Sequence, residues 1–351
     1  MLIPALTGVR AFAALWVVLF HFQRDVVLLV PGIAFAKPFI DRGYMGVDLF
    51  FALSGFILAY RYAESFKAGI SREQYFSFLR ARLARIYPVH LFTLHLMILI
   101  LIIAQMVGAK PFTFDVVAYI SHLTLTHAWL GYDLAFNYPA WSISAEWLAY
   151  LLCPVLLLGL SRIPALSTFI AIVVAAYALS LLLLAGHILP EGLARIVGEF
   201  TAGAALFYVF RLLPNWRWSV AAQGIALIMI LLSALRPQMG HTLDWAFGLL
   251  ILGLAYQKGP LTRFLSLRPV VYAGEISYAL YMTHAIVQVF LVTVLPAKAF
   301  SGSGTLVRLA VLLAYVVVVA GAAALTYYVI EEPGRRWVRP TSRRPVPAPA
   351  D

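Results

Sequence analysis

The chain alternates long apolar runs with short polar segments, and the length of these runs predicts membrane-spanning helices. A helix needs about 20 mostly apolar residues to cross a bilayer. Allowing for tilt and for short gaps, windows of this kind fall at residues 9–30, 45–61, 88–107, 141–160, 165–186, 194–211, 218–235, 243–257, 276–296 and 306–330. The window at 243–257 is the shortest. The pattern predicts an all-α, polytopic helical bundle of about ten transmembrane helices.

Composition supports a membrane protein without a separate soluble domain. Of the 351 residues, 63% are hydrophobic and only 12% are charged, whereas soluble domains carry about 25% charged residues. We therefore expect one integral membrane domain over residues 1–337. The segment 338–351 contains "RPTSRRPVPAPAD", a basic and Pro-rich stretch that predicts a disordered tail. Cys153, the single cysteine, lies in an apolar run and is expected to be a small core residue.

The first apolar segment resembles a signal peptide at first sight, but we expect it to remain as a helix. Gln23, Arg24 and Asp25 interrupt it, and the small residues around Ala34 lie too far beyond its apolar core. Most of the 26 lysines and arginines fall on one side of a ten-helix arrangement, with the densest group in an expected loop over residues 61–85. The positive-inside rule then places both termini in the cytoplasm. This bias explains the net charge of +11 without nucleic-acid binding.

Arg10 and His21 lie at the two ends of the apolar run "VRAFAALWVVLFHF". Eleven residues are about three helical turns, or roughly 16 Å, so both side chains lie on nearly the same face. An arginine that snorkels and a histidine satisfied in the core would explain each residue alone. Ionisable groups at membrane depth are nevertheless costly, which makes both candidates for a functional site.

Asp48 lies at the start of the apolar window 45–61. As an acid it could stabilise a helix N-terminus, or it could pair with His21 on the neighbouring helix. Arg82 and Arg85, in "RARLARIYP", are three residues apart and share a helical face. A basic cytoplasmic segment explains them in general, but two guanidinium groups at the mouth of a helix also suit a phosphate-rich ligand.

Glu146 lies in "YPAWSISAEWLAYLL", next to Trp141 and Trp147. These aromatic residues fit either the interfacial belt of a membrane protein or a surface that stacks against sugar rings. In "GEISYALYMTHAIV", Tyr281 shares a helical face with the tyrosine three residues earlier, and His284 lies deeper in the same apolar segment.

The remaining histidines do not form a metal motif. His90 and His95 are five residues apart, a poor spacing for two ligands on one helical face, and the chain contains no HExxH or CxxC pattern. We therefore expect no metal site.

These segments occur in a fixed order: an arginine, ten residues and a histidine; "GVDLFFALSGF"; "RLARIYP"; "WSISAEWLAY"; "GEISYALYMTH"; and "EEPGRRW". Together, over about residues 5–337, they resemble the membrane acyltransferase-3 family, whose members include bacterial O-antigen and exopolysaccharide O-acetyltransferases. The resemblance implies a multi-pass enzyme of the bacterial inner membrane. Such an enzyme would move an acyl group, usually acetyl, from cytoplasmic acyl-CoA to a hydroxyl of a glycan or lipid-linked saccharide at the outer face. Acyl-CoA would be a co-substrate, and no bound cofactor is expected.

With this resemblance in view, we hypothesise a role for each candidate residue. His21 would be the general base that activates the acceptor hydroxyl, with Asp48 or Glu146 orienting its ring. A covalent acyl-histidine is the competing route. Arg10, Arg82 and Arg85 would bind acyl-CoA. The acceptor would be bound by Glu146, Trp141, Trp147, His284 and Tyr281.

A different class of function also fits buried His, Glu and Arg residues in a ten-helix bundle. A proton-coupled transporter or a lipid-linked sugar flippase would need such groups as well. Purified protein in detergent separates the two classes, because an acyltransferase forms product from acyl-CoA and acceptor without a sealed membrane and a carrier does not. The sequence leaves the acceptor, the acyl group and the oligomeric state open.

Overall fold

The computed structural model describes residues 3–109, 111–235 and 242–338, and within these ranges every regular element is helical. Eight elements give segments long and apolar enough to span a membrane: α1 (Pro4–Leu29), α3 (Gly46–Phe66), α4 (Arg72–Met106), α6 (Trp141–Leu160), α7 (Leu166–Ala185), α8 (Glu191–Leu212), α13 (Ser277–Val294) and α15 (Thr305–Thr326). The chain is therefore a multi-pass membrane helical bundle.

All ten predicted windows coincide with helices. The two that fall short of a full span are α9 (Ser219–Leu235) and α10 (Thr242–Ala255), which pack against each other as a pair. The remaining helices are short and connect the long ones: α2 (Lys37–Ile40), α5 (Val116–Leu123), α11 (Pro260–Leu265), α12 (Arg268–Glu275), α14 (Ala297–Phe300) and α16 (Glu332–Val338).

The basic segment 61–85 is almost entirely helical, which corrects its description as a loop. α3 continues to Phe66 and α4 already begins at Arg72. Ser71 caps α4, because its hydroxyl accepts a hydrogen bond from the Gln74 amide while the Gln74 side chain accepts one from the Ser71 amide. This reciprocal cap starts a helix in a polar sequence. Arg82 and Arg85 are thereby fixed on α4 before its apolar part begins.

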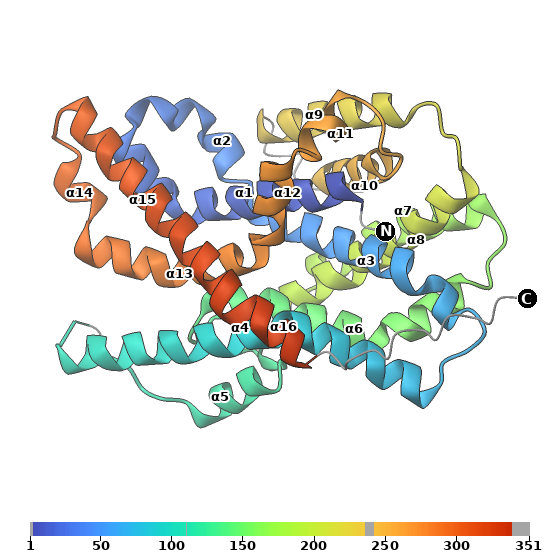
Figure 1. Cartoon of the computed structure of the whole chain (residues 1–351), viewed down its shortest axis with the longest axis horizontal. Coiled ribbons are helices and arrows are strands. Elements are labelled where there is room, and N and C mark those ends of the chain that lie inside the picture. The colour runs from blue at the N-terminus through green and yellow to red at the C-terminus, as the bar shows by residue number, and fades with distance from the viewer. Residues whose placement is uncertain (1–2, 110, 236–241, 339–351) are drawn as a thin grey trace, which may run out of the picture.

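The long helices surround a buried centre formed by α3 and α8. In Figure 1, α1, α3, α4 and α13 run broadly along the long axis, and α15 crosses them obliquely. Within its most apolar window, α8 is 83% buried, whereas α15 is 22% buried. A helix that is apolar but exposed in this way needs lipid around it. α8 therefore lies inside the bundle, and α15 lies at its periphery.

Glycines bring α3 and α8 into close contact. A Cβ at Gly55 would lie 2.1 Å from the Phe200 carbonyl oxygen, and one at Gly203 would lie 2.0 Å from the Ala52 carbonyl oxygen. Small residues allow such backbone approach between membrane helices. Gly55 and Gly203 are therefore packing positions between the two helices.

The C-terminal end of the membrane domain returns to the basic half of α4. α15 continues through a π-helical turn (Tyr327–Glu331) into α16, which packs against α4. The predicted disordered tail begins at Val338, the last residue of α16, and its remainder, 339–351, lies outside the described residues. Cys153 is free and fully buried, as expected for a core residue.

Candidate active site

Three neighbouring cavities in the described part of the bundle contain most of the candidate residues, and each is named here by its lining. The basic cavity, of about 260 Å³, is lined by Thr7, Arg10, Ile57, Arg61, Ala81, Arg82, Ala84, Arg85, Gly274, Glu275, Tyr327 and Arg335. The middle cavity, of about 80 Å³, is lined by Arg10, Val47, Phe50, Phe51, Leu53, Ser54, Ile57, Ser142, Ile143, Glu146, Ser277, Tyr278 and Tyr281. The aromatic cavity, of about 380 Å³, is lined by Val17, Phe20, His21, Tyr44, Val47, Ala128, Asp133, Leu134, Tyr138, Pro139, Trp141, Pro190, Glu191, Gly192, Arg195 and Tyr281.

The three cavities adjoin one another in a series. Arg10 and Ile57 line both the basic and the middle cavity. Val47 and Tyr281 line both the middle and the aromatic cavity. Arg10 thus stands where the first two cavities meet, and His21 lines the third. We call this series of three adjoining cavities the path. Because Arg10 and His21 lie on the same face of α1, both line it.

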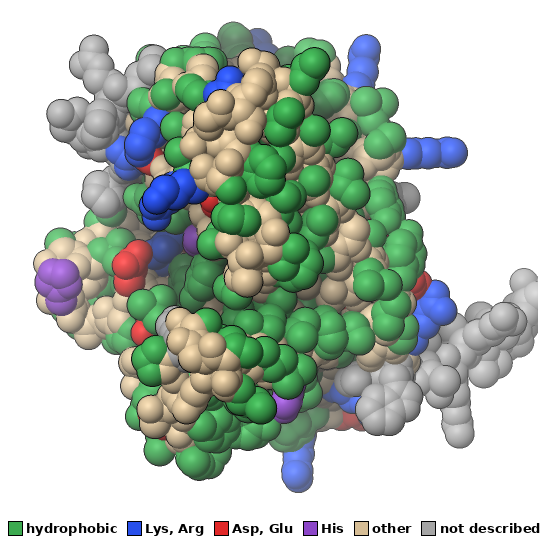
Figure 2. Space-filling view, turned by 90° about the vertical axis from the view of Figure 1, so that its left-hand side faces the viewer, with side chains coloured by type: hydrophobic (Ala, Val, Ile, Leu, Met, Phe, Trp, Pro, Cys, Tyr) green, Lys and Arg blue, Asp and Glu red, His purple; other side chains and the backbone are tan. Residues whose placement is uncertain are grey.

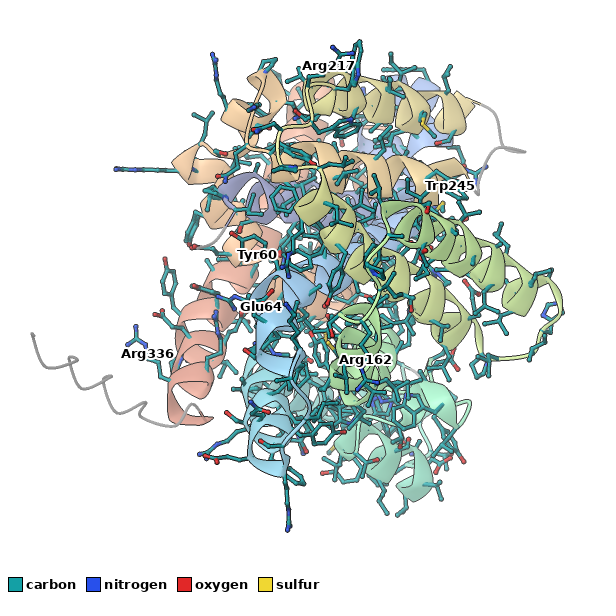
Figure 3. The ribbon with its side chains drawn as sticks, turned by 90° about the vertical axis from the view of Figure 1, so that its right-hand side faces the viewer. Tyr60, Glu64, Arg162, Arg217, Trp245 and Arg336 are labelled. Atoms are coloured by element: carbon teal, nitrogen blue, oxygen red, sulfur yellow. The ribbon has the colours of Figure 1, made fainter. Side chains whose placement is uncertain are left out.

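The basic cavity lies between the C-terminal half of α3, the N-terminal half of α4 and the start of α1. The segments that contain Glu275 and Arg335 complete its wall. Figure 3 looks at this end of the molecule, with Tyr60 and Glu64 of α3 labelled. Five arginines line the cavity against a single lining carboxylate, Glu275. This excess of guanidinium groups creates a positive potential suited to phosphate.

Arg82 and Arg85 both face the basic cavity, but their surroundings differ. Arg85 forms an ion pair with Glu331, a buried residue of the π-helical turn. Arg82 donates to the Tyr62 hydroxyl at 3.2 Å, and its guanidinium carbon lies 5.5 Å from the centre of that ring. The charge of Arg82 is therefore less compensated than that of Arg85. Arg61 adds a third guanidinium from α3, which sequence reasoning did not single out.

The middle cavity holds one cation and one acid at the centre of the bundle. Glu146 accepts a hydrogen bond from the Ser54 hydroxyl at 2.6 Å. The guanidinium carbon of Arg10 lies 5.6 Å from the centre of the Phe50 ring, and its Nε is buried without a hydrogen-bond partner. The aromatic neighbours of Glu146 allowed a position near the outer surface. The structure instead places its carboxylate in the middle cavity with Arg10.

His21 is oriented by the backbone of its own helix. Its Nδ1 lies 2.9 Å from the Val17 carbonyl oxygen, which can only accept a hydrogen bond. Nδ1 therefore carries the proton in the neutral ring, and Nε2 keeps its lone pair. No hydrogen bond from another described residue occupies Nε2. A histidine in this tautomer that lines a cavity can take a proton from a bound hydroxyl.

A second layer of polar residues surrounds His21. The ring of His284 lies 4.8 Å from that of His21, and the ring of Tyr138 lies 5.0 Å from it, measured between centres. The Gln288 side-chain amide donates to the His21 carbonyl at 2.6 Å, and the Tyr138 hydroxyl donates to Gln288 at 3.1 Å. His284 is fully buried and does not line the three cavities, so it supports His21 and does not itself face the path.

The hypothesis that Asp48 orients His21 needs correction. Both oxygens of Asp48 are held by Arg195, through Nε at 2.7 Å and Nη2 at 2.8 Å. Both side chains are almost fully buried. Arg195 engages Asp48 in a bidentate, buried pair, and the side chain of His21 bonds to Val17 and not to Asp48. The Val17 carbonyl orients His21 instead.

The aromatic cavity contains the predicted Trp141 and Tyr281 but not Trp147. The guanidinium carbon of Arg195 lies 5.1 Å from the centre of the Trp141 ring. Gly192 leaves room for that ring, because a Cβ there would lie 2.6 Å from it. Trp147 is half-buried against the hydrophobic core and lines none of the three cavities. Only the first tryptophan of the pair faces the path.

Three histidines that line none of the three cavities stack on one another. The rings of His122 and His127 are 3.8 Å apart between centres, and His90 lies parallel to both at 5.9 and 5.7 Å. Parallel rings do not direct their nitrogens at one point. Among the described residues, no group of three or more His, Cys, Asp or Glu side chains is arranged to hold a metal ion.

Sequence reasoning missed Arg195, Asp133, Tyr138 and Gln288. Arg195 could have been found, because it is an arginine inside the apolar window 194–211 and the rule that selected Arg10 applies to it equally. Tyr138 and Gln288 carry no such signal. They matter only because α13 and the start of α6 meet beside His21.

Comparison with known proteins gives one consistent result. A model of the acyltransferase-3 family, described as an acyltransferase domain, matches residues 3–327. Acyltransferase MdmB of Streptomyces mycarofaciens is 31% identical over 167 residues, which are 46% of this chain and 41% of that protein. Protein 2 in the picA locus of Rhizobium radiobacter is 38% identical over 96 residues, 26% of this chain and 42% of that protein. The matches thus span less than half the length of either relative, and no solved structure matches the chain.

Proposed function

The chain belongs to the acyltransferase-3 family, and on this premise we propose that it is an O-acyltransferase of the bacterial inner membrane. It moves an acyl group, which we take to be acetyl, from cytoplasmic acyl-CoA to a sugar hydroxyl at the outer face. The acceptor is a cell-surface or exported glycan, or a lipid-linked saccharide. The observation that supports this most directly is the series of cavities that runs from five arginines past Arg10 to His21.

In this proposal the basic cavity receives the phosphates of CoA. Arg61 and Arg82 bind them first, because the charge of Arg85 is already balanced by Glu331. The thioester arm passes Arg10 into the middle cavity. Glu146 balances the charge of Arg10 there and contacts the reacting end of the acceptor. The arm must reach about 16 Å, the rise of the eleven residues that separate Arg10 from His21.

His21 then acts as the general base. Its Nε2 takes the proton of the acceptor hydroxyl as that oxygen attacks the thioester carbonyl carbon, the carbon–sulfur bond breaks, and the proton passes to the departing thiolate. The acceptor lies in the aromatic cavity against Trp141 and Tyr281, and His284 holds the imidazole in place. Asp48 contributes indirectly by fixing Arg195 beside that cavity.

Substitution of His21 tests the proposal. Purified protein in detergent is supplied with acetyl-CoA and with de-O-acylated polysaccharide from cells that lack the gene, and CoA release is measured. General-base catalysis contributes about 10²–10⁴-fold to a rate, so His21→Ala should lose at least about 10²-fold of the activity. His187→Asn, at an exposed loop position, is the matched control and should keep it. Full activity of His21→Ala, with normal thermal unfolding of both variants, would remove His21 from the mechanism.

Direct transfer and a covalent route differ in what labelled acetyl-CoA leaves on the protein. In the proposed direct route, label stays in acetyl-CoA until acceptor is added. Label that appears on wild-type protein without acceptor, and not on His21→Ala, would show an acyl-histidine intermediate instead.

A further inference from the structure

The aromatic cavity carries more negative than positive charge. Among its lining residues, Arg195 is the one cation, and Asp133 and Glu191 are acids. Asp48 lies behind Arg195 and binds it with both oxygens. The end of the path where His21 lies therefore holds one guanidinium and three carboxylates, of which Asp48 and Glu191 contact Arg195. Figure 2 looks onto this end of the molecule and shows acidic side chains and a histidine beside a recess left of its centre.

Arg195 is not free to bind an anion. Besides Asp48, it donates to Glu191 at 3.3 Å and to the Tyr44 carbonyl at 3.3 Å. The rings of Tyr44 and Trp141 lie against its guanidinium group. Most of its N–H donors are thus used by the protein itself, and its charge is compensated before any ligand arrives.

Asp133 is in the opposite situation. It lies half-buried in the turn between His127–Trp129 and Tyr138–Ala140 and lines the cavity. It has no hydrogen bond or ion pair with another described residue. An unpaired carboxylate in a cavity with tyrosine and tryptophan walls accepts hydrogen bonds from hydroxyl or ammonium groups and repels carboxylate or phosphate.

We propose that the aromatic cavity selects an acceptor sugar without negative charge, neutral or amino-substituted, and that Asp133 is the residue that imposes this selectivity. The inference rests on the proposed function, because it takes the aromatic cavity as the acceptor site. It adds that acidic sugars such as uronic acids, and sugars presented with a phosphate in the cavity, are poor acceptors.

Binding of three matched glycosides tests the inference without requiring turnover. The probes are 4-nitrophenyl β-D-glucopyranoside, its 2-amino-2-deoxy analogue and 4-nitrophenyl β-D-glucuronide, titrated against the full chain in detergent by ligand-observed NMR. We expect the glucuronide to bind at least about tenfold more weakly than the other two, the size of one partly screened like-charge contact. The amino sugar should bind most tightly.

Charge changes at Asp133 sharpen the test. Asp133→Asn should reduce the difference in affinity between the glucoside and the glucuronide. Asp133→Lys should reverse it, so that the glucuronide binds more tightly than the glucoside. Glu73→Gln, which removes an exposed acid at the start of α4, should leave the difference unchanged. The inference is overturned if none of the three probes binds, if the glucuronide binds as well as the glucoside, or if Asp133→Lys leaves the order intact. Selective binding without CoA release from acetyl-CoA would instead count against the proposed function alone.

Discussion

The guanidinium group of Arg195 lies between two aromatic rings and binds two carboxylates, although it is almost completely buried. Its pairing with Asp48 joins α3 to α8 at the end of the bundle that holds the aromatic cavity. Removing one partner of a buried ion pair leaves an uncompensated charge, which costs about 3–5 kcal/mol, whereas replacing both with apolar residues is often neutral or stabilising.

Asp48→Leu should therefore lower the thermal stability of the protein in detergent by several degrees, and Asp48→Leu combined with Arg195→Met should restore most of it. Asp41→Leu breaks the exposed pair with Lys37 and serves as the control, since exposed pairs contribute at most about 1 kcal/mol. If the double variant is as unstable as Asp48→Leu, the ion pair is not what makes Asp48 important.

Besides the hydrophobic core, helices in this bundle meet at glycine positions and through polar side chains. Gly55 and Gly203 set the distance between α3 and α8, the two helices that carry Asp48 and Arg195. The histidine stack joins α4 to the segment between α5 and α6, where His127 lies 3.0 Å from the Ala140 carbonyl oxygen through Nε2. Both kinds of contact hold the walls of the aromatic cavity.

Gly203→Ala tests the first contact. The added methyl group meets the Ala52 carbonyl oxygen, and overpacking of this kind costs about 1–3 kcal/mol. The gain in helix propensity, about 0.5–1 kcal/mol, offsets part of it. Gly321→Ala adds the same methyl group to α15, where nothing lies within 4 Å, so it should be neutral or stabilising. Thermal unfolding that moves equally in both variants would contradict the close α3–α8 contact.

The histidine stack makes stability depend on pH. Burial lowers the pKa of His122 to about 2 and that of His127 to about 4, from 6.5. Between pH 6.5 and about 4 the unfolded chain binds protons that the folded chain does not. Stability is therefore complete above 6.5 and falls with decreasing pH, by up to about 1.4 kcal/mol per pH unit for each histidine.

Thermal unfolding between pH 7.5 and 5 should show this decline, and His122→Leu should make it shallower because one buried titratable group is gone. His187→Asn, which removes an exposed histidine, should leave the slope as it is. An unchanged slope in His122→Leu would mean that other groups cause the decline.

At the scale of the whole molecule, the basic cavity lies at the same end of the bundle as other basic connecting segments. The basic cavity lies at the end where α3 stops and α4 starts, the same end as the connecting segments that carry Arg162 and Arg217 (Figure 3). α9 and α10 follow each other as a pair, so counting both or neither as spans leaves the ends of the chain on the same side. We expect this side to be the cytoplasm.

Cysteine labelling measures this orientation. Cys153→Ala removes the one cysteine, and single cysteines are then introduced at exposed positions. Phe35→Cys and His187→Cys should react with an impermeant maleimide in intact spheroplasts. Lys67→Cys and Arg217→Cys should react only after the membrane is opened. The reverse pattern would place the basic cavity outside and exclude cytoplasmic acyl-CoA as its ligand.

The local pattern of the sequence was sufficient to predict the helices and two residues that line the adjoining cavities. Ten apolar windows all became helices, because the length of an apolar run is a property of consecutive residues. Arg10 and His21 line one path because they lie on one helix, where the 3.6-residue period alone places them on one face. The helical start of α4 at Arg72 was missed, because a capped polar helix has no apolar signature.

Partners between helices were decided only by the tertiary structure. Asp48 binds Arg195, which is 147 residues away, and not His21. Glu146 meets Ser54 and Arg10 in the middle cavity, and Trp147 packs against the hydrophobic core while Trp141 lines the aromatic cavity. An ion pair or a cavity wall depends on which helix faces meet and how closely, and glycines such as Gly203 determine that distance through contacts that no spacing in the chain encodes.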